Sequence, residues 1–131
     1  MIGDCYLLAG LAGLQEEYPE MADTIVLTED VNENGIYAVQ IFVMGYRTVY
    51  TVDDYFPVSW WDDLGAAKIS EDGGIWAPII EKAVAKMFGT YDNIASGASS
   101  GSNYWLTGFP GVQHSISPSN LNHIHDYFKW A

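Results

Sequence analysis

The sequence predicts an α+β domain in which a central buried helix packs with further helices and an antiparallel hairpin. Three stretches carry this prediction: the apolar segment 5–17, the β-branched and aromatic segment 36–53, and the periodic segment 76–88. A chain of 131 residues suits one compact domain with a core of its own. With 49% apolar residues, the chain has the composition of an ordered globular protein.

The segment 5–17 is predicted to be a helix that lies inside the domain. Its positions are filled by leucines and small residues on nearly every face: Leu7, Leu8, Ala9, Gly10, Leu11, Ala12, Gly13 and Leu14. A helix that is apolar all round is buried, and its small residues let neighbours come close. Asp4 is placed to cap its N-terminus, and Pro19 fits a chain that has left the helix.

The segment 36–53 predicts two antiparallel strands. It is rich in β-branched and aromatic residues, and Met44-Gly45 interrupts it where a short glycine-containing turn is expected. The aromatic-rich segment 53–63 that follows is predicted to be irregular.

The segment 76–88 has helical spacing. One face carries the apolar residues Trp76, Ile79, Ile80, Ala83, Val84, Met87 and Phe88. Glu81, Lys82 and Lys86 are predicted to lie away from that face. Pro78 belongs in a first turn and Gly89 ends the helix. A Gly/Ser loop is expected at 96–102, and a terminal helix at 119–130 with Ser119 or Asn120 as its cap.

Charge and cysteine content narrow the possible partners and the compartment. Seventeen acidic residues against five basic ones give a net charge of −12, which repels phosphate backbones and anionic lipids, so no nucleic-acid partner is expected. No stretch approaches the ~18 consecutive apolar residues of a membrane span, and no secretory signal is recognised. A single cysteine rules out an internal disulfide and indicates a reducing compartment, the cytoplasm.

That single cysteine, Cys5, stands at the front of the first predicted helix. The partial positive charge of a helix N-terminus favours the thiolate, which is the reactive form. Free N–H groups of a first turn can also receive an oxyanion, so the position suits acyl transfer. The alternative is an inert buried thiol, because cysteine is among the most buried residue types.

Several motifs together resemble one family. "GDCYLLAGLAGL" resembles the nucleophile motif of calpains, the cytosolic papain-like cysteine proteases, which reads Gly-Asp-Cys-Trp-Leu-Leu-Ala-Ala. "VDDYFPV" is similar to the family's segment after a β-hairpin, and "WAPIIEKAVAKMFGTYDNIASGAS" to its second helix and Gly-Gly loop. "LTGFPG" and "SPSNLNHIHDYFKW" resemble the segments that follow in the family. The resemblance runs in order along nearly the whole chain, and it implies the N-terminal half of a papain-like cysteine protease core.

The resemblance implies roles for four residues. Cys5 would be the catalytic nucleophile, and Tyr6 would stand beside the cleft where the family usually has Trp. Gly97 and Ala98 would belong to a loop, from Ser96 to Ser99, that binds the substrate. There an extended protein or peptide would pair with backbone groups, as in strand addition. Ala98 replaces the second glycine of the family's pair.

The resemblance also implies that essential parts lie elsewhere. Papain-type enzymes place the catalytic His and Asn about 130–150 residues after the cysteine, which is beyond Ala131. None of His114, His123 and His125 matches the family's catalytic motif, and the oxyanion-stabilising Gln lies upstream of Met1. We therefore expect residues 1–131 to be the first subdomain, truncated on both sides, with 119–130 as a linker toward a missing second subdomain. By itself the chain is expected to be inactive.

Calpain cores bind calcium, so a calcium ion is possible in the parent enzyme. The family's Glu ligand near the second helix corresponds to Gly74 here, and the carboxylates nearby are Glu71 and Asp72. The sequence therefore predicts no metal ligand and no certain cofactor for this chain.

Two alternative functions, from other classes of protein, stay open. One is a non-catalytic calpain-like module that binds a peptide or its own second half, although the retained Cys5 argues against it. The other is a carbohydrate site built from Trp60, Trp61, Tyr104 and Trp105 with the pairs Asp53-Asp54 or Asp62-Asp63. Glycoside hydrolysis needs two carboxylates at a controlled separation, which adjacent acidic residues do not specify.

Overall fold

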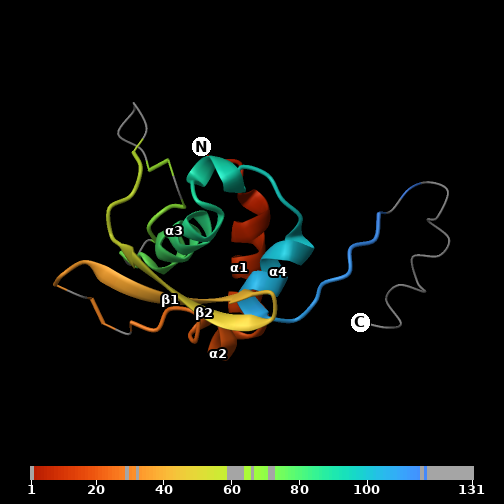
Figure 1. Cartoon of the computed structure of the whole chain (residues 1–131), viewed down its shortest axis with the longest axis horizontal. Coiled ribbons are helices and arrows are strands. Elements are labelled where there is room, and N and C mark those ends of the chain that lie inside the picture. Colours follow the sequence, from red (N-terminus) through yellow and green to blue (C-terminus); the bar gives the residue numbers. More distant parts are fainter. Residues whose placement is uncertain are drawn as a thin grey trace.

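The computed structural model describes residues 2–28, 30–31, 33–58, 64–65, 67–70, 73–115 and 117. The elements follow in the order α1 Cys5–Glu17, α2 Pro19–Ala22, β1 Ile36–Val43, β2 Tyr46–Asp53, α3 Trp76–Phe88, the 3-10 helix η1 Tyr91–Ile94, and α4 Ser99–Thr107. Figure 1 shows α1 between α3 and α4, with the hairpin of β1 and β2 crossing beside them. The predicted α+β class, with helices packed on an antiparallel hairpin, is confirmed.

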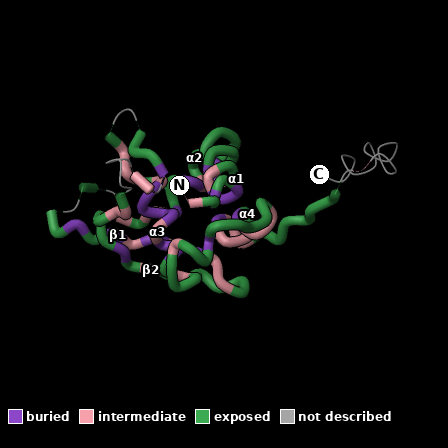
Figure 2. The backbone as a smooth tube through the Cα atoms, turned by 90° about the horizontal axis from the view of Figure 1, so that it is seen from above, coloured by how far each residue is buried: buried purple, intermediate pink, exposed green. Residues whose placement is uncertain are grey.

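Helix α1 has the predicted bounds, and its inner face lies in the core. The buried residues are Tyr6, Leu7, Leu11 and Leu14. The opposite face is exposed at Ala9, Ala12 and Gly13, as the change of colour along the tube in Figure 2 shows. Burial all round, which the composition of the helix predicted, therefore holds for one face only.

Helix α4 packs closely on α1 through small residues. A Cβ atom added at Gly10 would lie 2.8 Å from Ser102 Oγ, and Ser102 is fully buried. Its hydroxyl donates to the carbonyl of Ser99 at 2.8 Å. The Gly/Ser loop expected at 96–102 is thus wrong from Ser99 onward, because this packing outweighs the low helix propensity of Ser and Gly.

The hairpin is confirmed, with Ile36 opposite Asp53 and Val43 opposite Tyr46. Its turn has positive φ at both central residues, 50° at Met44 and 84° at Gly45, as the tight hairpin turn that matches strand twist requires.

The segment 25–28 pairs with the outer edge of β1 at residues 38–40. The N–H of Leu27 donates to the carbonyl of Ala38 at 2.8 Å, and the N–H of Gln40 donates to the carbonyl of Ile25 at 2.8 Å. Only β2 therefore has an outer edge that no backbone segment pairs with among the described residues.

Helix α3 also has the predicted bounds and ends at Gly89, whose φ is 98°. The prediction that Glu81 lies away from the buried face is wrong, because its side chain is 0% exposed. The reason is that Ala67 and Asp4 meet this side of α3, and the N–H of Ala67 donates to Glu81 Oε2 at 2.5 Å. Conversely, Trp76 and Phe88 are more exposed than the periodicity predicted.

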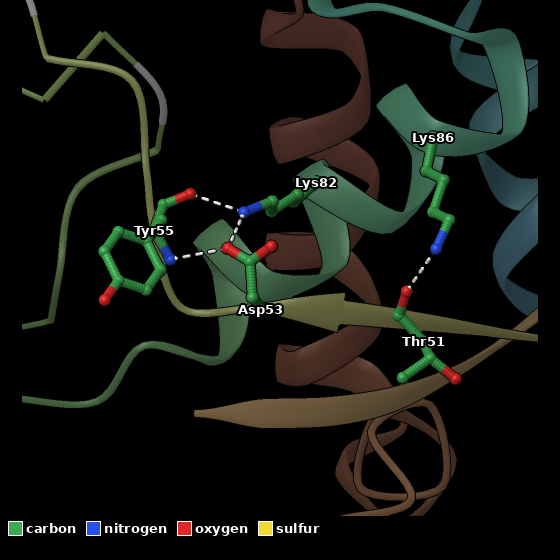
Figure 3. A network of polar contacts seen from close by, with 5 residues as sticks. All are labelled: Thr51, Asp53, Tyr55, Lys82 and Lys86. Atoms are coloured by element: carbon green, nitrogen blue, oxygen red, sulfur yellow. Dashed lines mark hydrogen bonds and ion pairs between the residues drawn. The ribbon is translucent and has the colours of Figure 1, made fainter. Parts of the chain in front are cut away.

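Two lysines of α3 form hydrogen bonds with β2 and with Tyr55, which follows β2 in the chain (Figure 3). Lys82 donates to the Asp53 carboxylate and to the carbonyl of Tyr55. Lys86 donates to the carbonyl of Thr51 at 2.6 Å. The hydrogen bond from Lys82, and then that from the Tyr55 N–H, hold the pKa of Asp53 below its usual range.

Some predicted features lie outside the described residues: the terminal helix 119–130, the pairs Trp60-Trp61, Asp62-Asp63 and Glu71-Asp72, and His123 and His125. The short elements α2 and η1 were not predicted. Pro19 lies beyond the end of α1, as predicted, and it begins α2, since its fixed φ and missing N–H suit a first helical turn. Within the described part of the chain, no helix is long and apolar enough to cross a membrane.

Candidate active site

Cys5 is the first residue of α1 and its side chain is exposed. The carbonyl of Asp4, the residue before it, accepts the N–H of Leu7 at 2.8 Å and that of Leu8 at 3.3 Å. These bonds form the first helical turn directly behind Cys5. The thiol therefore stands at a helix N-terminus, open to a reagent or substrate, and the structure does not support the alternative of a buried inert thiol.

Tyr6 and Gly97, which come from distant parts of the sequence, lie in contact. A Cβ atom added at Gly97 would lie 2.5 to 2.9 Å from three atoms of the Tyr6 ring, so only glycine fits here without a shift. The ring itself is 7% exposed, because the loop before α4 crosses it. The structure thus brings together two of the residues that sequence reasoning assigned to the substrate cleft.

We expect Gly97→Ala to lower the free energy of unfolding by about 1–3 kcal/mol, because overfilling a packed site forces neighbours to move. The matched control is Gly13→Ala on the exposed face of α1, where nothing lies within 4 Å of the added atom. That change removes a helical glycine and should stabilise by about 0.5–1 kcal/mol. Urea denaturation of both variants checks the opposite signs, and equal effects would contradict the close packing.

Trp105 of α4 forms an aromatic cluster with Tyr6 and Phe88. Its ring centroid lies 6.3 Å from that of Tyr6, edge to face, and 4.9 Å from that of Phe88. Burial, and then the nearby Asp4 carboxylate, raise the pKa of Tyr6. The Tyr6 hydroxyl therefore stays protonated at neutral pH, and the side chains of the cluster carry no charge.

Ala98, the fourth predicted site residue, is exposed and precedes α4 in an extended conformation. Its carbonyl accepts the N–H of Gly101 at 2.9 Å and that of Ser102 at 3.3 Å, so it already serves the first turn of α4. The loop that crosses Tyr6 is consequently shorter than predicted, and it consists of residues 96–98.

Asp4 and Glu81 form a buried carboxyl pair that sequence reasoning missed. Asp4 is the N-cap residue of α1, but its side chain makes no capping hydrogen bond, which corrects the capping prediction. Burial, and then a hydrogen bond with Asp4, raise the pKa of Glu81 from 4.5 to about 8. A signal was present in the sequence, since the helical neighbours of Glu81 at i±3 and i±4 are all apolar: Ala77, Pro78, Val84 and Ala85.

The structure does not bring a described histidine to the cysteine. His114 is exposed in the segment that follows α4. Figures 1 and 2 both place that segment on the far side of α4 from the start of α1. Gly97 and Trp105 thus lie against Tyr6, the residue after Cys5, and the structure places no described histidine with them.

The described residues do not fit a calcium site. Gly74 offers no side-chain oxygen at the position where calpains have a Glu ligand, and Glu71 and Asp72 lie outside the description. Within the described ranges, no group of three or more His, Cys, Asp or Glu residues is gathered closely enough to hold a metal ion.

An exposed cysteine that begins a helix of an α+β core is the arrangement of a papain-like thiol protease, and comparison with known proteins identifies the family. The sequence model of the calpain family cysteine proteases matches residues 1–129. The chain therefore belongs to the calpain family, as its motifs predicted.

Two relatives show how much of a calpain the chain represents. It is 31% identical to the calpain-type cysteine protease ADL1 of Oryza sativa subsp. japonica over 112 aligned residues. The aligned stretch covers 86% of this chain and 5% of that protein. It is 32% identical to the human calpain-2 catalytic subunit over 99 aligned residues. The aligned stretch covers 74% of this chain and 14% of that protein. The chain thus spans a small part of the length of these relatives.

Proposed function

We propose that this chain is the nucleophile-bearing part of a calpain-type cysteine endopeptidase and that Cys5 is its nucleophile. The observation that carries the proposal is the exposure of Cys5 at the N-terminus of α1, within the family's Gly-Asp-Cys motif. Protein substrates follow from membership of a protease family.

In the proposed reaction the Cys5 sulfur attacks the carbonyl carbon of a peptide bond. The carbonyl oxygen takes up negative charge, the amine product leaves with a proton, and water then hydrolyses the thioester that remains. The helix N-terminus favours both the thiolate and the oxyanion. A histidine has to accept and return the proton, and an Asn orients it. We propose that both come from a second subdomain that faces Cys5.

The proposed substrate path passes over Tyr6. The loop 96–98 holds an exposed, irregular backbone against this ring, and an extended peptide would pair with it by strand addition. The methyl group of Ala98 stands where the family has a glycine, so we propose a narrower approach to the cleft than in relatives with two glycines.

The proposal predicts that activity needs two polypeptides. The isolated chain should cleave casein or a fluorogenic peptide negligibly, and adding a separately produced second calpain subdomain should restore cleavage. Cys5→Ala should lower the restored rate by about a thousandfold or more, the range seen when a catalytic nucleophile is removed.

Iodoacetamide supplies a control, because it should label Cys5 in the native chain whether or not the second subdomain is present. Turnover by the isolated chain that disappears in Cys5→Ala would contradict the proposed role of the second subdomain. Restored cleavage that survives in Cys5→Ala would contradict the role of Cys5.

A further inference from the structure

Asp4 and Glu81 are buried to a degree that is rare for acidic side chains, with exposures of 3% and 0%. Carboxylates are almost never so deeply buried unless a cation pairs with them. The nearest candidate along α3 is Lys82, but its ammonium group donates to Asp53 and to the carbonyl of Tyr55 (Figure 3). The pair therefore needs another source of stabilisation.

The hydrogen-bond pattern shows which source is available. Glu81 Oε2 accepts the N–H of Ala67 at 2.5 Å. Glu81 Oε1 and Asp4 Oδ2 are both buried without a donor among the described residues, and hydrogen bonding with Asp4 is one cause of the raised pKa of Glu81. Two ionised carboxylates can only accept. A single proton on Glu81 Oε1 turns it into a donor to Asp4 Oδ2, which satisfies both oxygens at once.

The groups around the pair favour this protonated arrangement. Tyr91 of η1 faces it with a buried hydroxyl that has no described partner. Burial, and then the carboxylates of Glu81, Asp53 and Asp4, raise the pKa of Tyr91. The Asp4 carboxylate thus opposes a second negative charge at Glu81, whereas the Tyr91 hydroxyl is uncharged and supplies no counter-charge.

The start of α1 depends on this pair through short connections. The backbone carbonyl of Asp4 accepts the first N–H groups of the helix, while its side chain meets Glu81 of α3. The N–H of Ile2 donates to the carbonyl of Gly65 at 3.2 Å, close to Ala67, which Glu81 holds. A Cβ atom at Gly3 would lie 2.4 Å from the carbonyl oxygen of Ala95, so the chain has little room to shift just before Cys5.

We propose that Asp4 and Glu81 are positioning residues, and that one proton shared between their carboxyl groups fixes the N-terminus of α1 and with it Cys5. The inference rests on the proposed function only where it treats Cys5 as the nucleophile. The shared proton and its effect on Cys5 are measurable in the isolated chain, without catalysis, so their failure and the failure of the protease proposal are distinguishable.

The first test is amide hydrogen exchange of Leu7 and Leu8 between pH 5 and pH 8. Opening of the pair releases the Glu81 proton in this range, so the protection factors in the wild-type chain should fall by up to about tenfold per pH unit. In Glu81→Gln the amide donates to Asp4 and its oxygen accepts from Ala67 at every pH, so this fall should disappear. Glu16→Gln, which makes the same charge change at an exposed position of α1, should behave like the wild type.

The second test is the rate of Cys5 alkylation by iodoacetamide. At pH 6 the wild type and Glu81→Gln should react within about twofold of each other. At pH 9, where Glu81 ionises in the folded wild type, the carboxyl pair that begins at Asp4, the residue before Cys5, carries a second negative charge. This charge repels the negative charge on the attacking sulfur. The wild type should then react about threefold or more slowly than Glu81→Gln, and Glu16→Gln should follow the wild type. A purely structural role of Glu81 would leave the ratio of rates independent of pH.

A third measurement needs no folded variant. In wild-type chain labelled with ¹³C at the Glu side-chain carboxyl carbons, one resonance should titrate near pH 8. The proposal is overturned if no Glu resonance titrates above pH 7, if protection of Leu7 and Leu8 has the same pH dependence in Glu81→Gln, or if the ratio of alkylation rates is the same at pH 6 and pH 9.

Discussion

Leu7→Ala should lower the free energy of unfolding by about 2–5 kcal/mol, the range for a leucine truncated in a close-packed core. Leu7 is 0% exposed and lies on the inner face of α1, two residues after Cys5. The loss combines the transfer of the removed methyl groups with the cavity that remains. Such a loss is a large share of the stability of a single domain, and urea denaturation measures it.

The chain offers a matched control at Leu27, whose side chain is 45% exposed. Leu27→Ala leaves the backbone bond to Ala38 in place, and it should change the free energy of unfolding by less than about 1 kcal/mol. If Leu7→Ala does not fold, Leu7→Met keeps the side-chain volume and should cost less than about 1.5 kcal/mol. Equal losses at positions 7 and 27 would contradict the central place of α1.

Raising the pH from 5 to 8 should destabilise the wild-type chain by up to about 1.4 kcal/mol per pH unit through Glu81 alone. The pKa of this carboxyl rises from 4.5 to about 8 on folding. The folded state therefore binds more protons than the unfolded state in this range, and stability falls as the pH rises. The contribution is fully present below about pH 4.5 and is lost by about pH 8.

Urea denaturation at several pH values, compared with Glu81→Gln, isolates this effect, because the other groups titrate in both proteins. The wild type should lose stability relative to the variant as the pH rises, and Glu16→Gln should keep the wild-type slope. If the free energy of unfolding changed with pH in the same way in the wild type and in Glu81→Gln, Glu81 would ionise normally in the folded chain.

Local sequence signals predicted the main elements of the fold but not how they pack. The bounds of α1 and α3 follow from the apolar spacing of their residues, and for α3 also from Gly89 after Phe88. The hairpin follows from two β-rich runs around Met44-Gly45. Helix α4 was missed in part because its first turn is made of residues that seldom form helices. Its stability comes from the contact of Ser102 with Gly10, which no local window contains.

The candidate site shows the same division. Cys5 was assigned to the site because its motif is contiguous, and Gly97 because the family resemblance extends to its loop. The contact between Gly97 and Tyr6 joins distant segments, and so does the meeting of Asp4 with Glu81. Glu81 was assigned to the solvent side because charge outweighs position in a pattern of apolar residues, although its helical neighbours are apolar. The tertiary environment decides whether such a carboxyl ionises.

The contact of Lys86 with Thr51 bears on how the chain avoids aggregation. An unpaired strand edge is a template for another strand, and lysines on the edge are one way in which proteins block it. The Lys86 ammonium group donates a hydrogen bond to the Thr51 carbonyl on the outer edge of β2. The segment 25–28 pairs with the outer edge of β1. An extended chain that approaches, whether a substrate or a second copy of this protein, is therefore excluded from continuing the sheet at Thr51. Lys86→Ala would expose this carbonyl, and we expect the variant to associate through the edge of its hairpin more readily than the wild type.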